Sequence, residues 1–465
     1  MRKLYILGFA LVLAGCAGLK PDYTKPAVDL PAGWRDAPAD GVQARDARWW
    51  KVYGDPLLDR LVDEALAHNA NVMLAIARVD EARAALSATS ADQRPQVSAG
   101  ANRSRTRVSQ RGPTPPGANP EFSDTRMAAG VSYEIDLWGR LRNATQAARA
   151  DLLATEAARE TVLITLTSDV AHSYFALRAF DGQLDATRRS LAARSEALGM
   201  QKRRFDVGDI SEFDYRQLQA DVAAERALLP VLELQRAQQE NVLAVLLGKS
   251  PREIYEGALE AGSDPEDRTV AIVVPAGLPS DLLLRRPDLV QAEQTLIAAN
   301  ARVAVARAAY FPTLSLTGYL GSESVALSGL FTGPAGIWQA ALAAGQPIYA
   351  GGRIDAQVQA AGARERQALA QYQLVIQNAF RDVRDALVAQ AKARERLAAE
   401  SERVTALRTT LRFARLRYQN GMTGQLEVLD AERNLLAAEQ NRIDALRSQR
   451  AAIADLFKAL GGVWS

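Results

Sequence analysis

The chain has 465 residues, of which 48% are apolar and 24% are charged, and its formal net charge is +2. This length can bury a large core, and the near balance of acidic and basic residues excludes the strongly basic surface that nucleic-acid binding requires, so we expect no nucleic-acid partner. The two histidines fall within helical patterns without other ligands nearby, so we expect no metal site, no cofactor and no catalytic residues.

The first residues have the features of a secretory signal. A basic start precedes an apolar run that is too short to span a membrane as a mature helix, and small residues lead up to Cys16, the only cysteine. We therefore expect residues 1–15 to be a signal peptide. Leu13-Ala-Gly-Cys16 resembles the bacterial lipobox, which implies cleavage before Cys16 and covalent lipid on that residue. A core role for Cys16 is the weaker interpretation.

Residues 16–55 are punctuated by prolines, which predicts an extended segment. Near its end, Trp49 and Trp50 could grip a ligand, but we expect them to anchor a core. Asp55 followed by Pro56 is an N-cap with proline at the first helical position, and it predicts a helix over 56–89.

After Pro95 the hydrophobic period changes from about 3.6 to 2, which predicts a β-hairpin over about 95–137. A second hairpin is predicted over about 312–349. On the clearest strands, alternate positions are apolar: Met127, Ala129, Val131, Tyr133 and Ile135; Leu314, Leu316, Gly318 and Leu320; Trp338, Ala340, Leu342 and Ala344.

This alternation is typical of transmembrane β-barrel strands, although a half-buried soluble sheet can show the same pattern. Four strands would form an open sheet, and its unpaired edges cannot lie in lipid. Closure of a membrane barrel therefore needs several chains.

Each hairpin is followed by a long proline-free helical pattern, from Leu141 to about Arg204 and from Ile354 to about Arg417. Each would be roughly 95 Å long. Shorter return helices are predicted from about 211 to 247, where Pro230 should bend or break the helix, and from about 425 to 460.

The chain contains two copies of one unit. Gly208 and Gly421, in the turns between long and return helices, lie 421 − 208 = 213 positions apart, and other landmarks share this offset. Glycine supplies the positive φ that such turns need. We expect a first repeat over 56–248, a connector over 249–279 and a second repeat over 280–465, with Ser280 as an N-cap.

Taken together, the motifs resemble the outer-membrane factor (TolC-like) family, and more closely its lipoprotein branch. The resemblance covers nearly the whole mature chain. It rests on Cys16, Trp49-Trp50 before Asp55-Pro-Leu57, Arg285-Arg-Pro-Asp-Leu289, Tyr310-Phe-Pro312, Pro347-Ile-Tyr-Ala-Gly-Gly-Arg353, and residues 418–430.

This resemblance implies a mainly helical, internally duplicated protein that acts as the outer-membrane exit channel of a tripartite efflux pump. Three chains, each giving four strands, would close a twelve-stranded barrel, and their helices would form a long periplasmic α-helical barrel. The implied cargo is drugs, toxic small molecules or metal ions. The implied partners are two further copies of the chain, outer-membrane lipid, a periplasmic adaptor and an inner-membrane transporter.

Within the family, the turns between long and return helices form the periplasmic tip. Glu427 and Asp430 match acidic positions of the tip constriction, and Asp214 matches another in the first repeat. Tyr418 matches a tyrosine that in some relatives holds the tip shut, while Thr423 stands where some relatives carry a basic residue. The alternative for the carboxylates is a solvated acidic turn favoured by the helix dipole.

Two other functions remain open from the residues alone. One is an exit channel for protein secretion. The other is a coiled-coil lipoprotein that bridges membranes structurally, which would suit the helices but not the four alternating strands.

Overall fold

The computed structural model describes residues 23–27, 48–109, 111, 119–257 and 286–462. The predicted signal peptide, Cys16, Ser280 and much of the connector lie outside the described residues. The chain forms two compact units, one of residues 1–27, 78–156 and 291–373 and the other of residues 28–77, 157–290 and 374–465. Each unit therefore contains parts of both sequence repeats.

The helices follow the same order in the two repeats. A short 3-10 helix, η2 (Trp49–Tyr53), precedes the first repeat. That repeat contains α2 (Pro56–His68), α3 (Ala70–Ala91), α4 (Arg140–Asp206) and α5 (Glu212–Leu246), and the short α6 (Pro251–Glu256) follows in the connector. The second contains α7 (Pro287–Ala308), α8 (Arg353–Gln419) and α9 (Gln425–Ala459). The long helices α4 and α8 each have 67 residues, and the return helices α5 and α9 each have 35.

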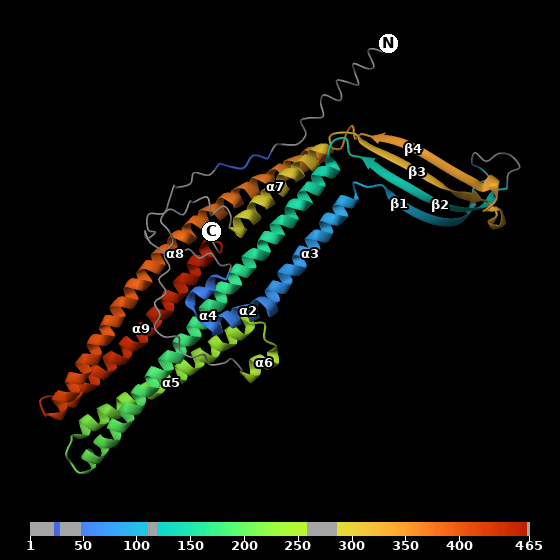
Figure 1. Ribbon diagram of the computed structural model, residues 1–465. Helices are drawn as coiled ribbons and strands as arrows, with labels where there is room; N and C mark the ends of the chain where they lie inside the picture. Colours follow the sequence, from blue (N-terminus) through green and yellow to red (C-terminus); the bar gives the residue numbers. More distant parts are fainter. Residues whose placement is uncertain (1–22, 28–47, 110, 112–118, 258–285, 463–465) are drawn as a thin grey trace. The chain divides into compact units, whose positions relative to one another are not determined.

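Four antiparallel strands form one sheet in the order β1-β2-β3-β4, seen side by side in Figure 1. They are β1 (Gln96–Arg107), β2 (Glu121–Ile135), β3 (Thr313–Ser324) and β4 (Gly336–Gly345), with two short 3-10 turns, η4 (Leu327–Gly329) and η5 (Gly333–Ala335), between β3 and β4. Directly paired residues share a face, and Val97 pairs with Val131, Val131 with Gly318, and Gly318 with Ala340. This register brings the predicted apolar positions of β2, β3 and β4 to one face, together with Val97 of β1.

The uninterrupted helix predicted over 56–89 and the possible break at Pro230 are both absent from the structure. The single helix expected over 56–89 is interrupted at Asn69, whose Nδ2 donates to the Leu246 carbonyl at 2.8 Å while its Oδ1 accepts from the Asn71 amide at 2.8 Å. Because Asn69 packs against the end of α5, its side chain caps the start of α3, and the preceding helix does not continue through it. Conversely, α5 runs unbroken through Pro230. Proline has no amide hydrogen to donate to the carbonyl four residues earlier, but Pro230 is exposed, so water can bond to that carbonyl.

The repeats form equivalent contacts at the ends of their return helices. Nη1 of Arg286 donates to the Ala459 carbonyl at 2.5 Å, as Asn69 does to Leu246. The two donors are 286 − 69 = 217 positions apart, as Pro95 and Pro312 are, and the two acceptors are 459 − 246 = 213 positions apart, as Gly208 and Gly421 are. The structure therefore has an internal duplication at the level of individual hydrogen bonds.

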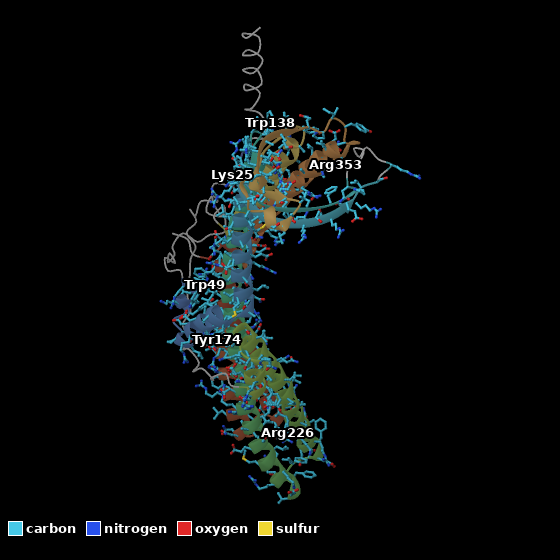
Figure 2. All side chains as sticks on the ribbon, turned by 90° about the vertical axis from the view of Figure 1, so that its right-hand side faces the viewer. Lys25, Trp49, Trp138, Tyr174, Arg226 and Arg353 are labelled. Atoms are coloured by element: carbon cyan, nitrogen blue, oxygen red, sulfur yellow. The ribbon has the colours of Figure 1, made fainter. Side chains whose placement is uncertain are left out.

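An aromatic cluster forms the core where η2 meets α4 and α9. Trp49 stacks on Phe457 with ring centroids 4.9 Å apart, and its Nε1 donates to Thr167. Trp49 and Trp50 are both 4% exposed, which fits the expectation that they anchor a core. Figure 2 labels Trp49 and, on α4, Tyr174 in this unit.

Asp55 links this core to the start of α2. Its carboxylate accepts from the amides of Leu57 and Leu58, which caps the helix, and also accepts from the Tyr174 hydroxyl at 2.5 Å. Burial, together with this hydrogen bond, raises the pKa of Tyr174.

Candidate functional site

The two turns that join long and return helices have the same backbone hydrogen bonds. At the first turn, the Gly208 amide donates to the Phe205 carbonyl and the Asp209 amide to the Arg204 carbonyl, both at 2.9 Å. This pair of bonds, with φ of +78° at Gly208, is a Schellman motif.

At the second turn, the Gly421 amide donates to the Tyr418 carbonyl at 3.0 Å and the Met422 amide to the Arg417 carbonyl at 2.9 Å. Gly421 has φ of +68°. An added Cβ would meet nothing within 4 Å at Gly208 or Gly421. Both turns thus require glycine for its backbone freedom and not for space.

The first turn is held by contacts within its own helical hairpin, which consists of α4 and α5. Phe205 stacks on Tyr215 of α5 with centroids 5.1 Å apart and ring planes 5° apart. Arg204 pairs with Asp209 at 2.7 Å, and this hydrogen bond raises the pKa of the Arg204 guanidinium. These contacts fasten α4 to the start of the turn and to α5.

The second turn instead contacts the other hairpin through the Tyr418 hydroxyl. This oxygen accepts from Nε2 of Gln201 at 2.8 Å and from Nη1 of Arg204 at 3.2 Å, both on α4. The same hydroxyl donates to Oε1 of Gln425, at the start of α9, at 3.3 Å. Tyr418 therefore joins the ends of α4, α8 and α9.

The predicted constriction residues lie at the starts of the return helices, and all are exposed. Glu427 forms an ion pair with Arg417 at 3.3 Å, and Asp430 accepts from Nδ2 of Asn434 at 3.1 Å. Their spacing of three places Glu427 and Asp430 on the same side of α9.

Asp214 has a different environment on α5. Its carboxylate accepts from the Ser211 hydroxyl at 2.7 Å, and its amide donates to the same oxygen at 3.1 Å. Asp214 thus takes part in capping the helix. Among the described residues, no hydrogen bond or ion pair joins it to Glu427 or Asp430.

A buried ionic cluster in the same unit was not predicted from the sequence. Arg194 of α4 is 4% exposed, and its Nε lies 3.3 Å from Glu225 of α5 and 3.6 Å from Glu432 of α9. Glu432 also pairs with Arg415 of α8 at 2.8 Å. The cluster therefore ties together all four helices that reach the turns.

This ionic cluster borders a cavity of about 180 Å³, lined by side chains of α4, α8 and α9, including Arg194, Arg415 and Glu432. Nη2 of Arg194 and both carboxylate oxygens of Glu225 are buried without a hydrogen-bond partner. A signal was present in the sequence, because Arg194 comes three residues after Leu191 and four before Leu198, where an apolar residue is expected on the packed face.

Metal-binding clusters and membrane-spanning helices are both absent from the described residues. In the part of the chain that the structure describes, no group of three or more histidine, cysteine, aspartate or glutamate side chains is arranged to hold a metal ion. His172 pairs with Asp455 at 2.8 Å instead. Among the described helices, none carries an apolar stretch long enough to cross a membrane.

Comparison with known proteins agrees with this architecture. The model of the outer membrane efflux protein family matches residues 61–249 and 278–462. The cation efflux system protein CusC of Escherichia coli O6:H1 is 34% identical over 466 residues, which cover 99% of each chain. The probable outer membrane lipoprotein SilC of Salmonella typhimurium is 32% identical, also with 99% coverage of each. The crystal structure of the Campylobacter jejuni CmeC outer membrane channel superposes with a TM-score of 0.91 at 26% identity, covering 96% of this chain and 95% of that one.

Proposed function

The chain belongs to the outer membrane efflux protein family, and we propose that it forms the exit channel of a tripartite efflux pump in the outer membrane. The observation that carries this proposal is the extent of the family match, which includes all four strands and the long and return helices of both repeats. Transport through such a channel is passive. The cargo belongs to the classes that such pumps export, namely drugs, toxic small molecules or metal ions.

The sheet supports a homotrimer. Strands β1 and β4 are the two edges of the four-stranded sheet, and one face of that sheet is apolar. Unpaired edges are costly in lipid, so each edge needs a strand from another copy. Three copies would close a twelve-stranded barrel.

The remaining parts of the assembly follow from the same proposal. Covalent lipid on Cys16 would anchor the chain to the outer-membrane leaflet, and the relative SilC is itself named as a lipoprotein. An adaptor and an inner-membrane transporter would supply the opening and the energy. A structural bridging lipoprotein is the poorer candidate because it leaves the apolar sheet face without a role.

We further propose that Glu427 and Asp430 narrow the channel, with Asp214 contributing from the first repeat. In a trimer the first pair would gather six carboxylates, three from each position. Such rings of acidic side chains favour cations in a pore. Support comes from the exposure of both side chains and from their common side on α9.

The first experiment measures the mass and the bilayer conductance of the detergent-purified protein. A trimer that forms discrete, cation-preferring pores is the expected result. A monomer without conductance would overturn the proposed function and leave a bridging role as the better account.

The constriction is tested in the same bilayers. Glu427→Ala with Asp430→Ala should raise single-channel conductance and weaken cation preference, because both charge and bulk leave the narrowest point. Glu427→Gln with Asp430→Asn should weaken cation preference with a smaller rise in conductance. Glu253→Gln with Glu256→Gln on α6 removes two carboxylates elsewhere and should change neither quantity. Unchanged selectivity in both tip variants would exclude these residues as the constriction.

A further inference from the structure

Three arginines lie on β1 immediately beyond the apolar part of its outward face. In the sheet register Arg103 pairs with Thr125, Arg105 with Ser123, and Arg107 with Glu121. Because side chains alternate, these arginines share the face of Val97, Ala99 and Ala101, and neighbours within the row are about 7 Å apart. Arg103, Arg105 and Arg107 are called the arginine row below.

The arginine row has an excess of positive charge. Arg105 and Arg107 both pair with one carboxylate, that of Glu121, at 2.9 and 3.3 Å, and their side chains are 76% and 70% exposed. Arg103 is also exposed, and among the described residues it has no ion-pair partner. Three guanidinium groups against one carboxylate leave a net charge of +2. Ion pairs this exposed are weak, so the arginines remain available to another anion.

The two ends of the apolar face carry different chemistry. On β2 the apolar positions run from Ile135 to Met127, about 27 Å along the strand, which is comparable to the apolar band of outer-membrane barrels. At the end nearest the helices, Trp138 stacks on Phe311 with centroids 4.7 Å apart, and its Nε1 donates to the Pro312 carbonyl at 2.7 Å. Aromatic side chains of this kind are typical of a membrane interface. The opposite end, where Phe331 is also exposed, carries the arginine row in addition.

We propose that the arginine row binds the phosphate groups of phosphorylated glycolipid headgroups in the outer leaflet of the membrane. This inference rests on the proposed function, because that function places the apolar face against lipid and the hairpin end, opposite the helices, at the outer surface. Guanidinium groups bind phosphate oxygens in a bidentate manner. The acyl chains of the same lipid would lie on Val97, Ala99 and Ala101 directly beside the row.

The apolar surface next to the row favours a lipid headgroup over free phosphate. A free anion would meet only exposed charges, whose attraction is weak in water. An acylated headgroup would combine that attraction with burial of its chains on the same strand. The row should therefore discriminate between phosphate attached to a lipid and phosphate in solution.

The test is a native mass-spectrometry titration of the detergent-solubilised trimer with lipid A, a diphosphorylated, acylated glucosamine disaccharide. The triple variant Arg103→Gln, Arg105→Gln, Arg107→Gln should bind lipid A roughly tenfold more weakly. The triple lysine variant, which keeps the charges, should lose much less. Wild-type protein should bind dephosphorylated lipid A as weakly as the glutamine variant does.

Two comparisons make the result decisive. Arg126→Gln removes a charge from the opposite face of the same hairpin, where Arg126 lies over the Tyr319 ring at 4.3 Å, and it should leave lipid binding unchanged. Equal binding by wild type and the glutamine variant would overturn the proposal, as would displacement of lipid A by millimolar inorganic phosphate. All variants should retain the trimer mass and the conductance, so a loss of lipid binding is distinguishable from a failure of the channel.

Discussion

The two tip turns have the same backbone but different side-chain contacts. Gly208 and Gly421 both have positive φ and both complete a Schellman motif. The first turn is fastened within its own hairpin by the stack of Phe205 on Tyr215. The second is fastened to the neighbouring hairpin by the Tyr418 hydroxyl. Duplication has therefore preserved the path of the chain, while the side chains have diverged to join one copy to the other.

The helices above the turns show the same contrast. Adding 213 to the positions of Arg194 and Glu225 gives Leu407 and Ala438, so the ionic pair of the first repeat has apolar equivalents in the second. Ala438 is fully buried, as Glu225 nearly is. One backbone thus accommodates either a buried ion pair or two apolar residues at equivalent places.

Removing Arg194 should destabilise the protein most. Arg194→Met leaves the Glu225 carboxylate buried without its partner, which costs about 3–5 kcal/mol. Arg194→Leu with Glu225→Ala installs the residues of the second repeat and should recover part of that loss. The measurement is thermal unfolding of the detergent-solubilised protein.

A matched control uses an exposed ion pair on the same helix. Arg189 pairs with Asp185, and both side chains are about two-thirds exposed. Arg189→Met should therefore change the free energy of unfolding by less than about 0.5 kcal/mol. A loss for Arg194→Met no greater than this control would show that the ionic cluster does not stabilise the bundle.

The two turn glycines should respond equally to substitution. Gly208→Ala and Gly421→Ala should each cost about 1–2 kcal/mol, because alanine is disfavoured at positive φ and no neighbour adds a clash. Gly199→Ala, inside α4 and also without close neighbours, should instead stabilise by about 0.5–1 kcal/mol. Clearly unequal costs at the two turns, measured by thermal unfolding, would mean that their backbones are not equivalent.

Tyr418→Phe should loosen the contact between the two helical hairpins. The variant keeps the aromatic ring but lacks the hydroxyl. Gln201, which is 7% exposed, then loses the acceptor for its Nε2. A loss of about 1 kcal/mol would speed amide hydrogen exchange at residues 417–424 about fivefold. Tyr215→Phe keeps the stack on Phe205 and serves as the control. No acceleration in Tyr418→Phe, or equal acceleration in Tyr215→Phe, would contradict the assignment of Tyr418 as the link between hairpins.

The smallest expected effect concerns helix capping. Ser211 caps α5 through its side chain, whereas its equivalent Gly424 precedes α9 without a side-chain cap. Gly424→Ser should therefore stabilise α9 by a few tenths of a kcal/mol. Ser211→Gly should cost a similar amount, and a thermal shift of the same sign in both variants would show that capping does not distinguish the turns.

Much of this fold could be predicted because local chemistry determines it. A glycine after an apolar helical stretch predicted both turns, since few other residues adopt positive φ. Strict alternation on β2, from Met127 to Ile135, predicted which residues share a face, and the register then placed the matching residues of β1, β3 and β4 beside them. Patterns of this kind do not depend on distant parts of the chain.

The remaining features depend on contacts between distant residues. The interruption at Asn69 arises from the Leu246 carbonyl, which lies 177 positions away. The spacing of Arg194 from Leu191 and Leu198 indicates its burial, but in the sequence its partners Glu225 and Glu432 resemble the solvated charges of their helices. The family resemblance assigns Asp214 to a channel constriction, whereas its local hydrogen bonds join it to Ser211, the N-cap of α5. The sequence of one helix does not show which residue of another helix pairs with its charged side chain.

The equal lengths of the paired helices limit how this chain can change over evolution. Each long helix has 67 residues and each return helix 35. One residue inserted into α4 alone would rotate everything after it by about 100° and advance it by about 1.5 Å, so that Gln201 would no longer meet Tyr418. A viable change in length must therefore occur in both copies and in steps that keep the packed faces in phase, such as seven residues. The lengths of the helices in the two repeats are therefore expected to change together.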